Sequence, residues 1–365
     1  MTAHGDLDRS RISKLLAQEL TRFREARPRS LALIGRARAH MPNGMPMAWM
    51  ASDYDQPVYI DYGQGPGFTD VDGFSYADFN ASDMAMFCGH AHPAIVAAVQ
   101  AQVARSTQFL LPTQASVEVA EELARRYRVP QWQFTLSATQ ANTEAIRLAR
   151  AVTGREVIVL FQGHYHGHFE EGLVDLADGR AVPVQRGLSK GVTGRVRISQ
   201  FNDTAMLRAA LGPGDVALVL TEPAMTNNLH LLLPEPGWHQ ALRGLTRQHG
   251  TLLGIDETHT HVVGPGGASG LWQLEPDIVT IGKGSRAGCR WAPTGSPPDW
   301  GSNWMRHATS RPAARCSATR CPQRRRGRRS PRFLSRTPTR TPRPWAASSP
   351  TGSSRQSARP GCHGP

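Results

Sequence analysis

Two short apolar runs, each leading to a charged residue, constrain the fold of this chain most. The run Thr251–Ile255 comes directly before Asp256, and the run Asp277–Ile281 ends two residues before Lys283. Short, nearly continuous apolar runs are typical of strands that are buried on both faces of a parallel sheet. In open α/β sheets, ligands bind where such strands end. We therefore expect Asp256 and Lys283 to lie at one ligand-binding edge.

Other segments repeat this pattern. Strands are expected at Phe134–Leu136, Val157–Phe161, Val216–Thr221, Leu252–Ile255 and Ile278–Ile281, with helical stretches between them. The alternation predicts an α/β fold with a mostly parallel sheet covered on both faces. Upstream, the pattern indicates a helix over 6–27, two strands near Val58–Tyr62 and Gly67–Val71, and helices over Ala91–Val103 and Ser116–Tyr127.

The net charge of +13 is distributed unevenly. From Ser285 onward the chain has 17 Arg, no Lys and one acid, Asp299, whereas residues 1–284 have 25 basic and 28 acidic residues. The tail also contains 12 Pro and shows no helical or strand period, so we expect it to be disordered. Such a tail could bind nucleic-acid phosphates, but no nucleic-acid-binding module accompanies it, and nucleic acid is not the expected partner.

The composition predicts three parts, with boundaries at 80 and 284. We expect residues 1–80 to form an N-terminal helix and small-strand segment, 81–284 a large α/β domain, and 285–365 the Arg-, Pro- and Ser-rich tail. Only Cys88 lies before residue 285, which excludes a disulfide framework there. The N-terminus lacks the apolar core of a signal peptide and no run is long enough to span a membrane, so a cytoplasmic protein is expected.

Taken singly, a strand-end Asp is usually a cap and a lone Lys is usually solvated. Together they provide what pyridoxal phosphate requires: Lys283 to form a Schiff base with the aldehyde, and Asp256 to keep the pyridine nitrogen protonated. Ser137-Ala138-Thr139, between a strand and a helix, suits either a phosphate or an ordinary N-cap. In Gly163–His168 the alternating histidines point apart, so no metal site is expected, whereas the ring of Tyr165 could lie flat on a planar cofactor.

These residues resemble the class III (fold type I) pyridoxal-phosphate aminotransferases, and among them the branch that contains glutamate-1-semialdehyde aminomutase. The resemblance covers roughly residues 30 to 284, about seven tenths of the chain. The matching segments are Asp70-Val71-Asp72-Gly73, Gly89-His90-Ala91-His92-Pro93, Ser137–Arg150, Gly163–Gly167, Glu222-Pro223, Asp256-Glu257 and Gly282-Lys283.

The resemblance implies that residues 81–284 have the fold of the family's pyridoxal-phosphate-binding large domain, here incomplete. It also implies pyridoxal 5'-phosphate as cofactor, small amino and keto compounds as substrates, and a homodimer. It implies Lys283 as the Schiff-base lysine, which also moves the substrate proton, and Asp256 as the partner of the pyridine nitrogen. The remaining implied cofactor contacts are Ser137, Ala138 and Thr139 at the phosphate, Tyr165 on the ring, Asn227 near the ring hydroxyl, and Thr258 under the ring.

Three departures from the family pattern matter. Ala138 stands where Gly is usual, and Gln140 where Glu is usual. The aminomutase has an Arg for the substrate carboxylate near the N-terminus, but Gly44–Trp49 contains none, which favours an aminotransferase and leaves the aminomutase as the alternative. After Gly284 the family pattern is not recognisable, and the shift to Arg, Pro, Ser and Cys suggests a frameshifted gene. A truncated pseudoenzyme is therefore a further alternative, and we expect weak or no turnover.

Overall fold

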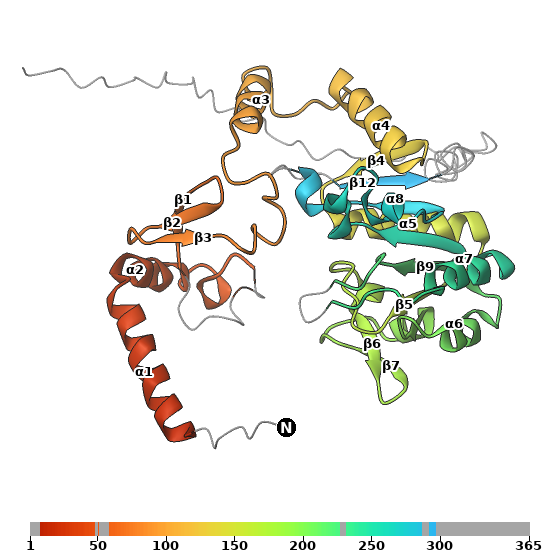
Figure 1. The fold of residues 1–365 in the computed structure, drawn as a ribbon, viewed down its shortest axis with the longest axis horizontal. Helices are drawn as coiled ribbons and strands as arrows, with labels where there is room; N and C mark the ends of the chain where they lie inside the picture. The colour runs from red at the N-terminus through yellow and green to blue at the C-terminus, as the bar shows by residue number, and fades with distance from the viewer. Residues whose placement is uncertain (1–7, 48–49, 51–57, 227–230, 287–291, 297–365) are drawn as a thin grey trace, which may run out of the picture. The chain divides into compact units, whose positions relative to one another are not determined.

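The computed structural model describes residues 8–47, 50, 58–226, 231–286 and 292–296 (Figure 1). Within these ranges, none of the helices combines the length and the apolar character that a membrane crossing requires. The predicted role of Asn227 falls outside the described residues, as does the predicted disorder of 297–365.

A mixed sheet is the largest of the sheets in the described structure. Within the described residues its seven strands are ordered β4-β12-β11-β10-β9-β5-β8. The pairs β11–β10, β10–β9, β9–β5 and β5–β8 are parallel, and β12 is antiparallel to both of its neighbours. This arrangement confirms the mostly parallel α/β prediction. The strands are β4 (Gln131–Thr135), β5 (Val157–Phe161), β8 (Val196–Ser199), β9 (Val216–Thr221), β10 (Leu252–Asp256), β11 (Ile278–Thr280) and β12 (Ala292–Ser296).

The core lies on both faces of this sheet, because successive residues of a strand point to opposite faces. Every residue of β5 is buried. Ile158 and Leu160 face the cluster that includes Ile146 of α5 (Ala138–Thr153). Val159 and Phe161 face the cluster built from α6 (Thr204–Leu211) and α7 (Trp238–Gln248). The near-continuous apolar strands are therefore explained by helices on both sides.

Upstream of the sheet the chain forms helices and a small antiparallel sheet, β1-β2-β3. The predicted hairpin is present with small shifts, and Asp72-Gly73 forms the turn between β2 and β3. A second helix, α2, begins at Pro28, where we predicted only the end of the first. The elements are α1 (Arg9–Glu25), α2 (Pro28–Ala37), β1 (Ile60–Gln64), β2 (Gly67–Asp70), β3 (Ser75–Ala77), α3 (Pro93–Val103) and α4 (Gln114–Tyr127).

Short elements lie between the longer helices and strands. They are η1 (Pro42–Gly44), η3 (Glu170–Leu173), β6 (Val174–Ala177), β7 (Arg180–Pro183), η4 (Val192–Arg195), η5 (Thr260–Val263), α8 (Gly267–Leu271) and η6 (Lys283–Arg286). The strands β6 and β7 pair with each other as a separate hairpin. The element η6 begins at Lys283, so the predicted lysine opens a turn directly after the sheet.

Two features differ from the predictions. Helix α4 begins at Gln114, two residues before the predicted start at Ser116, and the hydroxyl of Ser116 donates to the carbonyl of Thr113 (2.6 Å). The disorder predicted beyond Gly284 does not hold over 292–296, which form β12. This strand bonds to β11 on one side and β4 on the other. Ladder hydrogen bonds join main-chain groups, so an unfavourable composition does not prevent them.

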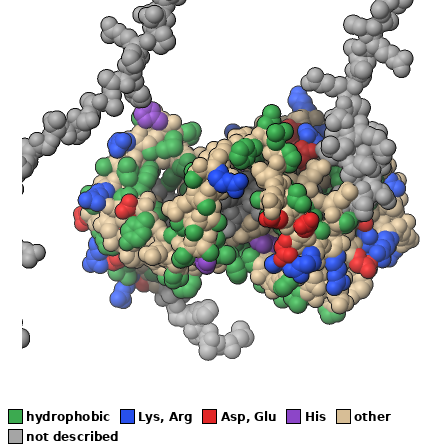
Figure 2. All heavy atoms as spheres, turned by 90° about the horizontal axis from the view of Figure 1, so that it is seen from above, with side chains coloured by type: hydrophobic (Ala, Val, Ile, Leu, Met, Phe, Trp, Pro, Cys, Tyr) green, Lys and Arg blue, Asp and Glu red, His purple; other side chains and the backbone are tan. Residues whose placement is uncertain are grey.

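Acidic and basic side chains are interspersed with apolar ones on the face shown in Figure 2. This agrees with the near balance of acids and bases that the sequence has before residue 285. Several large apolar side chains are also exposed, among them Phe109, Leu110 and Leu111.

Candidate active site

The two predicted reactive groups lie at the same edge of the sheet. Asp256 ends β10 and is in register with Thr280, the last residue of β11, three positions before Lys283. The amide of Glu257 donates to the carbonyl of Thr280 (2.8 Å), which keeps the two strand ends together beyond the ladder. The sequence prediction that Asp256 and Lys283 share one edge is consistent with this arrangement.

Asn142 of α5 ties the two strand ends together through its side chain. Its amide nitrogen donates to Asp256 Oδ2 (2.8 Å) and to the carbonyl of His166 (2.8 Å), and its amide oxygen accepts from Thr280 Oγ1 (2.7 Å). Asn142, Thr280 and Asp256 are all buried. Each of these contacts gives a buried polar group a partner, which offsets the cost of removing that group from water.

The carboxylate of Asp256 is held ionised by donors. Oδ2 accepts from Asn142 and from His166 Nδ1 (2.9 Å), and Oδ1 accepts from the amide of Thr258 (3.0 Å). Burial disfavours the charge, but these donors and the charge of His166 outweigh it, so the pKa of Asp256 lies below its ordinary value. Burial, followed by His166, lowers the pKa of His164 to about 3, so that ring is neutral. The rings of His164 and His166 stack with their centroids 5.4 Å apart, so the prediction that the alternating histidines point apart was wrong for this pair.

Lys283 is held in a different way. Its Nζ lies 2.6 Å from Asp83 Oδ2 and 2.5 Å from His259 Nε2. The Lys283 side chain is 13% exposed, whereas that of Asp83 is 53% exposed. The backbone of Lys283 has φ +47°, a left-handed conformation that is uncommon for a residue with a side chain. Asp83 lies in the run Ala81–Met84, in which all four residues have positive φ.

The N-terminus of α5 is the predicted phosphate site. The hydroxyl of Ser137 accepts from the amide of Gln140 (3.1 Å), so Ser137 is the helix N-cap. The side chain of Gln140 in turn accepts from the amide of Leu136 (3.2 Å), a contact that a Glu could make as well. The first amides of the helix, those of Ala138 and Thr139, have no partner within the helix and carry its positive end.

Two glycines explain the close approach of loops to this helix end. A Cβ on Gly167, which has φ +107°, would lie 2.8 Å from Thr139 Cα. A Cβ on Gly282 would lie 2.9 Å from Ala138 Cβ and 3.2 Å from Thr258 Cγ2. The Ala138 that replaces the usual Gly is thus accommodated because Gly282 has no side chain. Ala138, Thr258 and the residue before Lys283 meet at one point.

The structure describes the surroundings of two further predicted cofactor contacts, Tyr165 and Thr258. The ring of Tyr165 is 48% exposed and its hydroxyl lies 3.1 Å from His168 Nδ1. Burial, with the charge of Asp83 as the second cause, raises the pKa of Tyr165, so its phenol lies within electrostatic range of the carboxylate that holds Lys283. The hydroxyl of Thr258 is buried and has no hydrogen-bond partner in the described part of the chain.

Sequence reasoning assigned no role to Asn142, His166, His259 or Asp83. One of them carried a signal: Asn142 is the polar member of the buried stripe of α5, which otherwise contains Ala141, Ala145, Ile146, Leu148 and Ala149. A polar residue in such a stripe usually makes a buried hydrogen bond. The other three lie on loops, where their contacts depend on tertiary structure.

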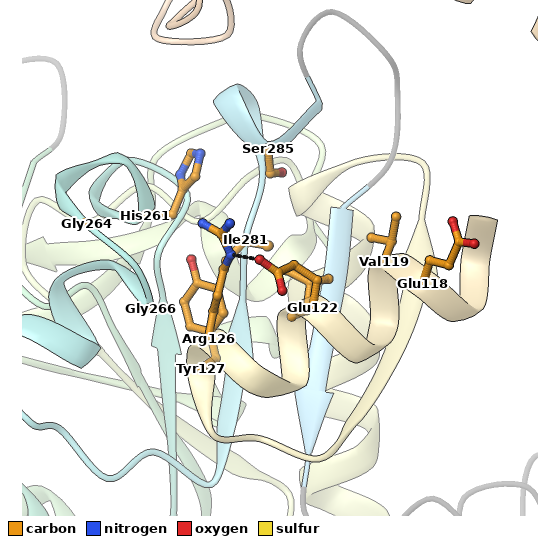
Figure 3. Close-up of a pocket in the computed structure, with 11 residues that line it drawn as sticks. Glu118, Val119, Glu122, Arg126, Tyr127, His261, Gly264, Gly266, Ile281 and Ser285 are labelled. Atoms are coloured by element: carbon orange, nitrogen blue, oxygen red, sulfur yellow. Dashed lines mark hydrogen bonds and ion pairs between the residues drawn. The ribbon is translucent and has the colours of Figure 1, made fainter. Parts of the chain in front are cut away.

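A separate cavity of about 360 Å³ lies beside α4, lined in part by Tyr127, His261 and Ile281 (Figure 3). Glu122 and Arg126 form an ion pair at its wall (2.6 Å). Hydrogen bonds from Arg125 and Arg126 lower the pKa of Glu122 to about 2. This cavity contains none of the predicted cofactor contacts, so the candidate site is the sheet edge and not this space.

The fold is that of an α/β protein with a lysine and a buried carboxylate at one edge of its sheet. The family model described as Aminotransferase class-III matches residues 49–304, and the chain belongs to this family. The match ends at residue 304, past the Gly284 to which the sequence resemblance extended.

Named relatives agree with this assignment. The chain is 36% identical over 264 residues to the glutamate-1-semialdehyde 2,1-aminomutase of Desulfitobacterium hafniense, covering 70% of this chain and 61% of that protein. It is 38% identical over 265 residues to the protein of the same name from Chloroflexus aggregans, covering 70% and 60%. The chain thus spans about three fifths of the length of these relatives.

Solved structures show the same fold. A glutamate-1-semialdehyde aminomutase from Pseudomonas aeruginosa superposes with a TM-score of 0.78 at 40% identity, over 84% of this chain and 69% of that one. A lysine-to-alanine variant of that protein was solved in complex with PMP. An omega-transaminase from Sphaerobacter thermophilus superposes with a TM-score of 0.71 at 31% identity, over 75% and 65%.

Proposed function

We propose that this chain is the pyridoxal-phosphate-binding part of an enzyme that transfers an amino group between an amino compound and a keto acid or aldehyde. The observation that carries the proposal is that Lys283 and the buried carboxylate of Asp256, whose pKa is lowered, follow the ends of two neighbouring parallel strands at one sheet edge. Family membership and the PMP complex of the Pseudomonas aeruginosa relative support it. The substrates are small amino and keto compounds, and the family resemblance further supports a cytoplasmic homodimer.

The residues at the sheet edge fit the cofactor. The buried hydroxyl of Thr258 has no partner among the described residues, and it lies beside the backbone of Gly282. The first amides of α5 have no acceptor within the helix, so they are free to donate hydrogen bonds to an anion such as a phosphate. Ser137 is already used as the N-cap, so in this proposal the phosphate is held by the amides of Ala138 and Thr139 and by the hydroxyl of Thr139, while Ser137 orders the loop.

Pyridoxal phosphate, when bound, supplies an aldehyde that condenses reversibly with amines and a ring that takes up electron density from the adjacent carbon. Lys283 provides the amine and later carries a proton to and from the reacting carbon. Asp256 would hold a proton on the ring nitrogen, and its Oδ1 is suited to this because Oδ1 accepts only the amide of Thr258 among the described residues. Asn142 and His166 fix Oδ2 and keep the carboxylate anionic. Tyr165 would cover the ring.

The test is amino-group transfer by the full chain, measured as the keto product formed from an amino donor with a keto acid as acceptor. Lys283→Ala should abolish transfer, and Lys190→Ala, at an exposed lysine, is the matched control and should not change it. Transfer that survives in Lys283→Ala would overturn the proposal. Product formed from a single amino-aldehyde compound, without a second acceptor, would instead identify an aminomutase.

A second candidate is a pseudoenzyme that binds the cofactor without turnover. The chain covers only 61% of the Desulfitobacterium relative, and the family match ends at residue 304 of 365. Cofactor attached to Lys283, together with no transfer for any donor, would favour this candidate. The frameshift hypothesis is tested separately: family-like sequence in another reading frame of the DNA beyond codon 284 would support it.

A further inference from the structure

The imidazole of His259 lies at the end of a chain of hydrogen bonds that begins at Glu222. Thr226 Oγ1 donates its only proton to Glu222 Oε2, and the same oxygen lies 2.7 Å from His259 Nδ1. Because the hydroxyl proton is already used, Thr226 must accept from Nδ1–H. This fixes the tautomer of the neutral ring: Nδ1 carries the proton and Nε2 presents its lone pair.

That lone pair points at the amine of Lys283, which lies 2.5 Å from Nε2. The side chains of His259 and Glu222 are 11% and 5% exposed, so this contact is largely shielded from water. Glu222 Oε2 also lies 3.5 Å from His259 Nδ1 and would stabilise a protonated ring. The sequence carboxylate–hydroxyl–imidazole–amine can therefore hold one proton at either Nε2 or Nζ.

We propose that His259 is the positioning residue of Lys283 and shares one proton with it. In the transfer, the Nζ–H bond breaks and an Nε2–H bond forms, so the charge moves from the ammonium to the imidazole beside Glu222. Lys283 is left as a neutral amine with a free lone pair, the form that condenses with a carbonyl. This deepens the proposed function and rests on it, since a neutral amine at Lys283 is what attachment of the cofactor requires.

Four other titratable groups act on this pair or on its direct neighbours and are part of its pH response. Asp83 contacts Nζ directly, and Glu222 lies behind the imidazole. His261 of η5 is electrostatically coupled to His259, and a Cβ on Gly284 would lie 3.0 Å from His261 Nε2. Tyr165 is coupled to Asp83. Of these four groups Asp83 is the one that contacts Nζ, and its negative charge favours the ammonium form of Lys283.

The test measures the neutral amine directly and needs neither cofactor nor substrate. The chain contains three lysines, and Lys14 and Lys190 are exposed, so they serve as internal references. Acetic anhydride acetylates only neutral amines, and the rate at each lysine is read by peptide mass spectrometry of the full chain. An exposed lysine gains about a hundredfold in rate from pH 6 to pH 8, because both values lie far below its pKa.

In the wild type, Lys283 should gain less than about tenfold over the same range, because two groups that share a proton titrate as a pair. His259→Gln keeps a hydrogen-bond acceptor but cannot take up a proton, and should restore the hundredfold gain. Thr226→Val should give an intermediate profile, and His40→Gln, at an exposed histidine, should leave the wild-type profile unchanged.

Two results would overturn the inference. One is a wild-type Lys283 that follows Lys14 across the pH range, and the other is a His259→Gln variant that keeps the flattened profile. The proposed function is tested by a different experiment, so amino transfer could fail while the flattened profile is found, and the reverse could also occur.

Discussion

The two reactive groups of this site are held by opposite means. Asp256 is buried, and its oxygens accept from Asn142, His166 and the amide of Thr258, all of which belong to the covered core of the sheet edge. Lys283 is held by Asp83, which lies in a run of left-handed residues, and by Nε2 of His259. A fixed position suits Asp256, which in the proposed function keeps one hydrogen bond to the cofactor throughout. A more exposed anchor suits Lys283, whose amine must leave the cofactor and return to it.

The largest effect on stability is expected in the buried bridge. Asn142→Leu removes the donor to Asp256 and the acceptor of Thr280, and should lower the free energy of unfolding by about 3 kcal/mol. Urea unfolding followed by circular dichroism measures this. The double variant with Thr280→Val should lose less than the sum of the two single variants, because they share one bond. A loss below about 1 kcal/mol would show that the bridge is not a rigid support.

The close approach of the Gly167 loop to α5 should give the next largest effect. Gly167→Ala places a methyl group against Thr139, so it should destabilise the chain by about 2 kcal/mol more than Gly187→Ala. The control has a similar positive φ (+88°) and nothing within 4 Å of its Cβ, so it carries the backbone strain alone. Equal losses in the two variants would show that the loop can move away from the phosphate site.

The charge of Asp256 should make stability depend on pH. Its pKa is depressed in the fold, so its contribution is fully present above its ordinary value of 3.8 and is lost as pH falls through the folded value. The stability difference between wild type and Asp256→Asn should therefore be constant from pH 7 to about pH 5 and shrink below about pH 4. A difference that grows as the pH falls would contradict the assignment of an ionised carboxylate.

The substitution Asp83→Asn should have the smallest effect on the free energy of unfolding. Asp83 is half-exposed, so Asp83→Asn should change the free energy of unfolding by less than about 1 kcal/mol. Loss of the anion disfavours the ammonium, so acetylation of Lys283 at pH 8 should become faster relative to Lys190. If Asp83→Asn were as destabilising as Asn142→Leu, the contrast between a rigid and a lightly held group would be wrong.

The sequence predicted the parts of this structure that depend on periodicity. The strands β5 and β9 were predicted to the residue, because apolar runs flanked by polar turns have few alternatives in an α/β chain. Asp256 and Lys283 could be predicted for the same reason: each follows such a run. The contacts of Asp83 and His259 with Lys283 could not, since they join loops that are 200 and 24 residues away from Lys283 in the chain.

The disorder predicted for residues 292–296 was wrong because main-chain hydrogen bonds hold this segment in the sheet. Strand β12 lies in a segment whose composition predicts disorder, yet it fills the space between β11 and β4, whose main-chain groups would otherwise be unpaired on those sides. Composition indicates how much apolar surface the side chains can bury. It contains no information about main-chain hydrogen bonds to neighbouring strands.

The most direct test of the central claim is the site of cofactor attachment. The full chain is mixed with one equivalent of pyridoxal phosphate, reduced with borohydride, and digested for peptide mass spectrometry. We expect the label on Lys283, little on Lys14 or Lys190, and a marked loss of label in Asp256→Asn but not in Asp83→Asn. Label spread over the two exposed lysines, with Lys283 unmodified, would contradict the account.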